Sequence, residues 1–147
     1  ALLNLPHNPL ETVLARRDKG FMKQAVAHHN LRVAKFKRLL HDDGNDEDKD
    51  HYQRIILKAM QEFNLSFPIV IKTPQGFSST DVYICDNVED ASRRLKQIID
   101  GGYGPDGRRV NCALMEEFIE GTEFAVNLVS SPTLTGVNGG VRVTDVW

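Results

Sequence analysis

The chain has 147 residues, of which 41% are hydrophobic and 26% are charged, and its formal net charge is −2. These values suit one globular domain with a sizeable core, and they exclude any general attraction to nucleic acid or to anionic lipid. Two unpaired cysteines, Cys85 and Cys112, give no disulfide framework or zinc pattern, and no apolar run is long enough for a membrane span, so we expect buried reduced thiols in a cytoplasmic protein.

Residues 1–30 are predicted to form an entering linker followed by a helix. Residues 2–10 contain two prolines and two asparagines, which favour irregular structure. Asp18 can cap the helix, and Asn30 can end it. The predicted apolar face of this helix consists of Phe21, Met22, Ala25 and Val26.

A short strand is predicted over residues 31–36, with Leu31 and Val33 facing inward. Residues 42–50 contain six acidic side chains, which is typical of a solvated loop, and their spacing does not match a calcium-binding EF-hand. His28, His29 and His41 lack a second pair at ligand spacing, so we expect surface histidines and no metal site.

The middle of the chain predicts a helix, two strands and a second helix. Apolar residues at helical spacing predict an amphipathic helix over residues 51–64. The β-branched run over residues 67–72 predicts a buried strand, and residues 81–85 return as its hairpin partner. Asn87 with Asp90 resembles a capping box, and it opens a helix that stops at Gly101.

Three more strands are predicted over residues 113–119, 123–129 and 141–147, with a loop containing Pro132 and Gly139 between the last two. The predicted fold class is therefore α+β, with a mainly antiparallel sheet and packing helices. No internal repeat is found.

Several common nucleotide and hydrolase motifs are excluded. The glycines of residues 102–107 follow a predicted helix and precede a strand, the reverse of the order that a dinucleotide fold requires, so we expect a helix-ending loop. The sequence has no Gly-Lys-Ser or Gly-Lys-Thr phosphate loop, and no Gly-x-Ser-x-Gly elbow.

A lysine and a small polar turn form a candidate phosphate site. Lys72 ends a predicted strand and offers a fixed ammonium, which can make a charge-assisted hydrogen bond to phosphate. Gly76, Ser78 and Ser79 lack bulk and can bring N–H and hydroxyl groups close to phosphate oxygens. By itself, such a hairpin is more typical of an ordinary turn.

An acidic strand is the second candidate. In residues 116–123 the acids and the hydrophobic residues face opposite ways until Gly121 interrupts them. Taken alone, this pattern is typical of a half-exposed strand.

In this order and spacing, the segments resemble the ATP-grasp superfamily over nearly the whole chain. Arg17-Asp18-Lys19 resembles the helix-opening Asp-Lys of the family, and the resemblance implies that Lys19 binds phosphate. Residues 67–74 resemble the strand that supplies a second phosphate lysine, here Lys72, although Thr73 replaces the usual proline. Residues 75–80 resemble the flap that closes over the phosphates.

Residues 115–119 resemble the hinge strand that clamps adenine between two lobes. The resemblance implies that Glu116 accepts a hydrogen bond from the adenine amino group, that the backbones of Glu117 and Ile119 contact the base edge, and that Phe118 flanks the ring. Glu123 is implied to bind the ribose hydroxyls.

The implied domain organisation is a linker and helix (1–30), an ATP-grasp nucleotide-binding lobe (31–117) and the start of a second lobe (118–147). The sequence of residues 117–147 looks closest to the amino-acid ligase branch of the superfamily. Superfamily members typically phosphorylate a carboxylate with ATP and let an amine displace the phosphate, so the implied ligands are ATP or ADP with a carboxylate and an amine.

The family's magnesium-binding acids are expected on later strands that this sequence does not include, so we assign no catalytic and no metal residue here. We expect magnesium in the full-length enzyme, an inactive 147-residue piece, and an exposed apolar patch through which the incomplete lobe could associate. The alternative is a noncatalytic module that binds nucleotide or a protein partner.

Overall fold

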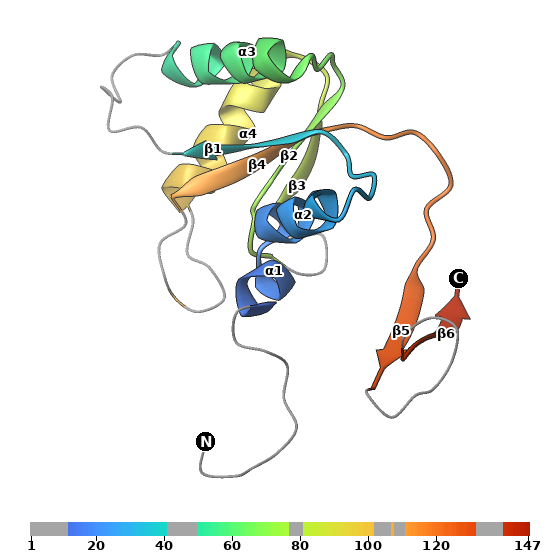
Figure 1. The fold of residues 1–147 in the computed structure, drawn as a ribbon. Helices are drawn as coiled ribbons and strands as arrows, with labels where there is room; N and C mark the ends of the chain where they lie inside the picture. The colour runs from blue at the N-terminus through green and yellow to red at the C-terminus, as the bar shows by residue number, and fades with distance from the viewer. Residues whose placement is uncertain (1–11, 41–49, 77–80, 102–106, 108–110, 132–139) are drawn as a thin grey trace.

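The computed structural model describes residues 12–40, 50–76, 81–101, 107, 111–131 and 140–147 (Figure 1). Four segments are helical: α1 (Val13–Arg17), α2 (Lys19–His28), α3 (His51–Phe63) and α4 (Val88–Gly101). Six segments are strands: β1 (Phe36–Leu40), β2 (Ile69–Lys72), β3 (Val82–Cys85), β4 (Cys112–Glu117), β5 (Val126–Ser130) and β6 (Val141–Val146). No described helix is long and apolar enough to cross a membrane.

The main sheet has the strand order β1-β4-β2-β3, and every pairing within it is antiparallel. The strand β4 therefore lies between β1 and β2, although it comes last of the four in the chain. This insertion brings Glu116 opposite Phe36 on one side and Val70 on the other. It also carries the acidic strand to the centre of the sheet, next to the lysine that ends β2.

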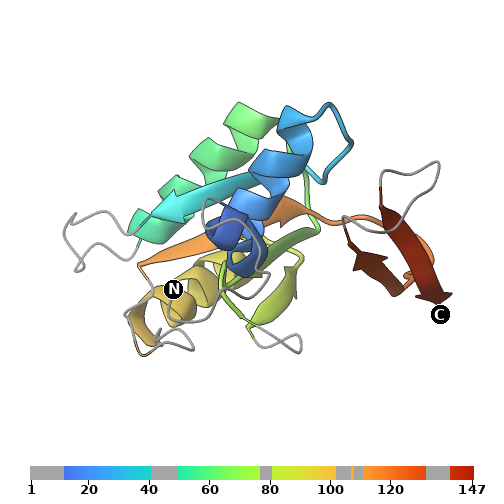
Figure 2. The same cartoon turned by 60° about the horizontal axis from the view of Figure 1, so that its bottom comes forward.

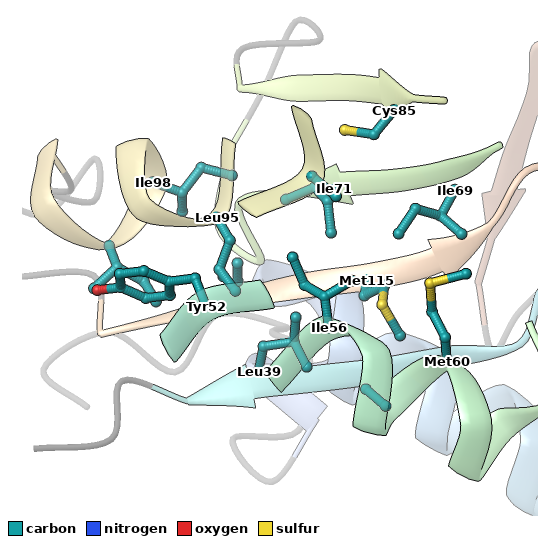
Figure 3. Close-up of a cluster of buried hydrophobic side chains, with 14 residues drawn as sticks. Leu39, Tyr52, Ile56, Met60, Ile69, Ile71, Cys85, Leu95, Ile98 and Met115 are labelled. Carbon is teal, nitrogen blue, oxygen red and sulfur yellow. The ribbon is translucent and has the colours of Figure 1, made fainter. Parts of the chain in front are cut away.

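The core lies between one face of this sheet and helices α3 and α4, and Figure 3 shows its side chains meeting. Alternate residues of each strand face the core, as the pleat of a strand requires. From β2 and β4 these are Ile69, Ile71, Ala113 and Met115, and from the helices they include Ile56, Met60, Leu95 and Ile98.

The other face of the sheet carries α2, which lies against it in both views (Figures 1 and 2). The strand residues that alternate with the core residues point to this side. Lys72, Leu114, Glu116 and Arg38 belong to this set, because they alternate with Ile71, Ala113, Met115 and Leu39 of the core. The candidate site is therefore built on the face away from the core.

Most predicted elements are found close to their predicted positions. The helices over 51–64 and from Asn87 to Gly101 form, and the side chain of Asn87 accepts a hydrogen bond from the Asp90 amide at 2.8 Å. The hairpin of β2 and β3 is confirmed, as are two buried free thiols at Cys85 and Cys112. Burial raises the pKa of Cys85 to about 12, which keeps this thiol protonated at neutral pH.

Two predictions near the N-terminus are wrong. The strand predicted over 31–36 begins at Phe36, and Leu31 is 62% exposed, because the pairing with β4 uses residues 36–40. The helix capped by Asp18 forms, but its expected apolar face is not buried: Phe21 and Met22 are exposed. This helix contacts the sheet through Gly20 and charged side chains instead.

The strands β5 and β6 form a separate antiparallel pair, which Figure 1 draws apart from the main sheet. The strand predicted over 113–119 ends at Glu117, and the next begins at Val126, so residues 118–125 form an irregular connection. All residues of β5 and β6 are exposed. The predictions for the acidic loop at 42–49, the glycines at 102–106 and the loop at 132–139 lie outside the described residues.

Candidate functional site

The start of α2 is fixed by one buried carboxylate. The Asp18 side chain accepts hydrogen bonds from the amides of Gly20 and Phe21, at 2.8 and 3.1 Å, so it satisfies two of the donors that a helix N-terminus leaves open. The amide of Lys19, which directly follows Asp18, donates to the Pro74 carbonyl at 2.9 Å. The first residue of α2 is therefore tied to the turn that follows β2.

Arg38 of β1 holds the same carboxylate from the sheet. Its Nη1 lies 2.6 Å from Asp18 Oδ1, and its Nη2 donates to Cys112 Sγ at 3.2 Å. Burial opposes the charge of Arg38, but the hydrogen bond with Asp18 raises its pKa above the ordinary value. A Cβ at Gly20 would lie 2.8 Å from Arg38 Nη1, so a larger residue there would displace the guanidinium that pairs with Asp18.

Two of three neighbouring lysines on this face are paired with the buried carboxylate of Glu116. Glu116 of β4 is 5% exposed, and its Oε2 accepts a hydrogen bond from Lys72 Nζ at 2.7 Å. Lys23 Nζ, one helical turn after Lys19, lies 3.4 Å from the same oxygen. The other carboxylate oxygen, Oε1, is buried and has no hydrogen-bond partner among the residues that the structure describes. A buried acceptor without a partner is uncommon, so Oε1 is a candidate acceptor for a ligand donor.

Lys19 is the third member of this lysine group. Its Nζ donates to the Gly76 carbonyl at 2.9 Å, so the side chain points into the turn after β2. Burial and the neighbouring ammonium of Lys72 lower the pKa of Lys19. An anion bound between these two lysines would relieve that repulsion, and we therefore expect it to favour the charged form.

A pocket of about 420 Å³ opens over this group. Its cations come from the end of α1, the start of α2 and the end of β2, and the described carboxylate in its lining, Asp18, is already paired with Arg38. The lining residues are Ala15, Arg16, Arg17, Asp18, Lys19, Met22, Lys23, Lys72 and Gly76. The pocket is thus strongly positive, on a chain whose net charge is −2.

The predicted hinge residues are less closely assembled than the lysines. Glu117 follows Glu116, but its amide donates to the Lys35 carbonyl at 3.0 Å and its Oε1 accepts from the Lys35 amide at 2.8 Å. That amide is therefore not available to a base in this conformation. Phe118 is half-buried, whereas Ile119 and Glu123 are exposed on the irregular connection.

The structure thus brings Lys19, Lys72, Gly76 and Glu116 together, while Ser78 and Ser79 lie outside the described residues. It adds two residues that the motifs did not indicate, Lys23 and Arg38. The position of Lys23, four residues after Lys19, was the available signal, because residues i and i+4 share one face of a helix. Arg38 could not be assigned without the pairing of β1 with β4.

The described part of the chain holds no group of three or more His, Cys, Asp or Glu side chains suited to a metal ion. Its acidic side chains at the site, Asp18 and Glu116, are already paired with cations.

Sequence comparison finds one family and several ligases. The family described as "ATP-grasp domain" matches residues 65–133. The D-alanine–D-alanine ligase of Lacticaseibacillus casei (strain BL23) is 26% identical over 130 residues, which are 88% of this chain and 30% of that ligase. The D-alanine–D-alanine ligase of Desulforudis audaxviator (strain MP104C) is 30% identical over 114 residues, 78% of this chain and 31% of that protein. The chain thus spans about a third of the length of these relatives.

Two solved structures share the fold at low sequence identity. The D-alanine–D-alanine ligase of Helicobacter pylori has a TM-score of 0.58 at 17% identity, covering 92% of this chain and 33% of its own. Phosphoribosylamine–glycine ligase of Thermotoga maritima has a TM-score of 0.58 at 16% identity, and the match covers 82% of this chain and 27% of that ligase. The predicted α+β fold with an antiparallel sheet and packing helices is confirmed.

Proposed function

We propose that this chain, which matches the ATP-grasp domain family over residues 65–133, is the ATP-binding part of a ligase that joins a carboxylate to an amine. The single observation that carries the proposal is the charge of the pocket. The described site holds three lysine ammoniums, from Lys19, Lys23 and Lys72. Its two described carboxylates are already in ion pairs, Asp18 with Arg38 and Glu116 with Lys72 and Lys23. Such an excess of buried positive charge is unfavourable unless an anion occupies the pocket.

A nucleotide triphosphate fits both the charge and the acceptor of the site. Lys19 and Lys72 would bind phosphate oxygens, and the turn with Gly76, Ser78 and Ser79 would close over them. The free Oε1 of Glu116 would accept a hydrogen bond from the amino group of adenine, since it is buried and lacks a donor.

The remaining predicted contacts come from the segment after β4. Glu117 and Ile119 would contact the base edge through their backbones, Phe118 would cover the ring, and Glu123 would bind the ribose. In the present conformation Ile119 and Glu123 are exposed, so these contacts require the connection at 118–125 to close over the nucleotide. A closure of this kind is common where two lobes enclose a ligand.

We propose that the complete ligase works through an acyl phosphate. The carboxylate substrate attacks the γ-phosphorus of ATP and releases ADP, and the amine then displaces phosphate to form the amide. The relatives join D-alanine to D-alanine, so amino acids are the proposed substrates. Lysine ammoniums stabilise the charge that develops on the transferred phosphoryl group. The 147 residues alone are expected to bind ATP without turnover, because they span about a third of these ligases.

The test is thermal unfolding of the chain with and without ATP. At ATP near 100 times its Kd, the stabilisation should be about 2.7 kcal/mol, or roughly 5–10 °C for a domain of this size. Lys72→Met should abolish most of the shift, whereas Lys96→Met, which removes an exposed lysine of α4, should leave it unchanged. A cooperative transition that ATP does not move would refute the proposal and favour a noncatalytic protein-binding module.

A further inference from the structure

We infer that Lys23 is a positioning residue: it is the counter-ion that keeps the Glu116 carboxylate charged when nucleotide phosphate draws Lys72 away. The inference rests on the proposal that Lys72 binds phosphate. It concerns a different step, namely how the charge of Glu116 is compensated once Lys72 has turned toward phosphate.

The geometry shows two ammoniums on one oxygen. Lys72 Nζ and Lys23 Nζ lie 2.7 and 3.4 Å from Glu116 Oε2. The side chains of Lys23, Lys72 and Glu116 are 13%, 16% and 7% exposed, so water screens none of these charges well. Lys72 makes the shorter contact with Oε2, and Lys23 makes the longer one.

Binding of a phosphate changes this balance. An ammonium that turns toward a phosphate oxygen weakens its hydrogen bond with the carboxylate, and a buried carboxylate without a partner is costly. Lys23 already lies within ion-pair distance of the same oxygen and reaches it from α2, so it need only move closer. Replacement of Lys72 by Lys23 as the ion-pair partner keeps Glu116 charged and in position to bind adenine.

The other charged groups that face Glu116 already have other hydrogen-bond or ion-pair partners. From the start of α2, Lys19 donates to the Gly76 carbonyl and Asp18 is paired with Arg38. Arg38, from β1, makes its described polar contacts with Asp18 and Cys112. From β2, Lys72 is the residue that phosphate would engage. Among the described residues, the printed ion pairs of Glu116 are with Lys72 and Lys23, so Lys23 is the ion-pair partner that remains when phosphate engages Lys72.

Removal of the Lys23 charge should therefore couple nucleotide binding to a proton. In Lys23→Met, the methylene stem still packs, but Lys72 cannot serve both phosphate and carboxylate. The Glu116 carboxylate then takes a proton from the buffer as ATP binds, and it becomes a neutral acid. In the wild-type chain Lys23 compensates Glu116 when Lys72 turns toward phosphate, so ATP binding requires no such proton.

The experiment is calorimetric titration of ATP into the 147-residue chain, in buffers of different ionisation enthalpy and at pH 7.5 and 8.5. Lys23→Met should take up about one more proton per ATP than the wild type, and its affinity should fall about tenfold more over that pH unit. Lys23→Arg should restore the wild-type behaviour. The double variant Lys23→Met with Glu116→Gln should lose the extra proton, because it has no carboxylate to protonate.

The outcomes separate the two proposals. If the wild-type chain does not bind ATP, the proposed function fails. If ATP binds and Lys23→Met shows the wild-type proton count, the inference about Lys23 is overturned, whatever the loss of affinity. A circular-dichroism melt of each variant establishes that it is folded; if Lys23→Met is not, Lys23→Gln and Lys23→Arg carry the same comparison.

Discussion

Asp18 links the first turn of α2 to the sheet, and Arg38 is the residue that makes this link. The carboxylate accepts two backbone amides of the helix and lies 2.6 Å from the guanidinium of β1. Its side chain is 1% exposed, so it depends on these partners for the solvation that it has lost. The positions of Lys19 and Lys23 depend on the same contact, because both follow the cap.

We predict that Arg38→Met destabilises the chain by about 1–3 kcal/mol, since it leaves a buried carboxylate with only its backbone donors. Urea denaturation would measure the change. Lys37→Met is the matched control on the same strand: its ion pair with Glu62 is partly exposed and should contribute at most about 1 kcal/mol. Equal effects of the two substitutions would contradict the role assigned to Arg38.

At the scale of single residues, the sequence indicates a candidate site residue where the residue type at a strand end or helix start is unusual. Lys72 ends a β-branched strand and Lys19 follows a capping aspartate, so both were identified. Lys23 was missed, because a lysine within a helix is ordinarily a surface residue. Its 13% exposure results from the position of β4, which no local pattern specifies.

The helix α3 shows how spacing alone fixes an element. Tyr52, Ile56, Ala59 and Met60 are buried on one side, as the helical period predicts, while Leu57 is 50% exposed. The αL residue Asn64 ends the helix, and its amide donates to Gln61. Strong periodicity with a clear end made this element predictable to within one residue.

We predict that Ile56→Ala, at a side chain with no exposed surface, lowers the free energy of unfolding by about 2–5 kcal/mol, because it opens a cavity in the core. The neighbouring Leu57→Ala should cost less than about 1 kcal/mol. Chemical denaturation of both variants tests this difference within one turn of one helix. A similar loss in both would mean that α3 does not pack by this face.

The strand β1 was predicted five residues too early because local propensity does not set register. Residues 31–36 and 36–40 both carry apolar and basic residues. What decides between them is the partner: Leu39 enters the core only when it pairs with Ala113. Register is a property of two strands, and the sequence of one strand specifies it weakly.

At the scale of the whole molecule, the described chain divides into a packed sheet and an isolated hairpin. The main sheet is covered by helices on both faces, whereas every residue of β5 and β6 is exposed. An isolated two-stranded hairpin is marginally stable in water. This hairpin carries exposed apolar side chains on both strands: Val126, Leu128, Val129, Val141, Val143 and Val146.

We predict that amides of β5 and β6 exchange with solvent at least about a hundredfold faster than those of β2 and β4, since local opening there breaks few packed contacts. Hydrogen exchange followed by mass spectrometry would measure this difference. The strand β3 is the matched control, because it is also an edge strand but belongs to the four-stranded sheet. Protection of the hairpin at the level of β3 would contradict this prediction.

The placement of β4 between β1 and β2 also constrains the order of folding during synthesis. At roughly 5–20 residues per second, β4 leaves the ribosome several seconds after β1, and until then β1 has no described partner in the sheet. Residues up to 100 can form helices and one hairpin, but neither the closed core nor the Lys72–Glu116 pair can exist. The nascent chain therefore acquires its closed core and the Lys72–Glu116 pair in the same late step, when the acidic strand is inserted between β1 and β2.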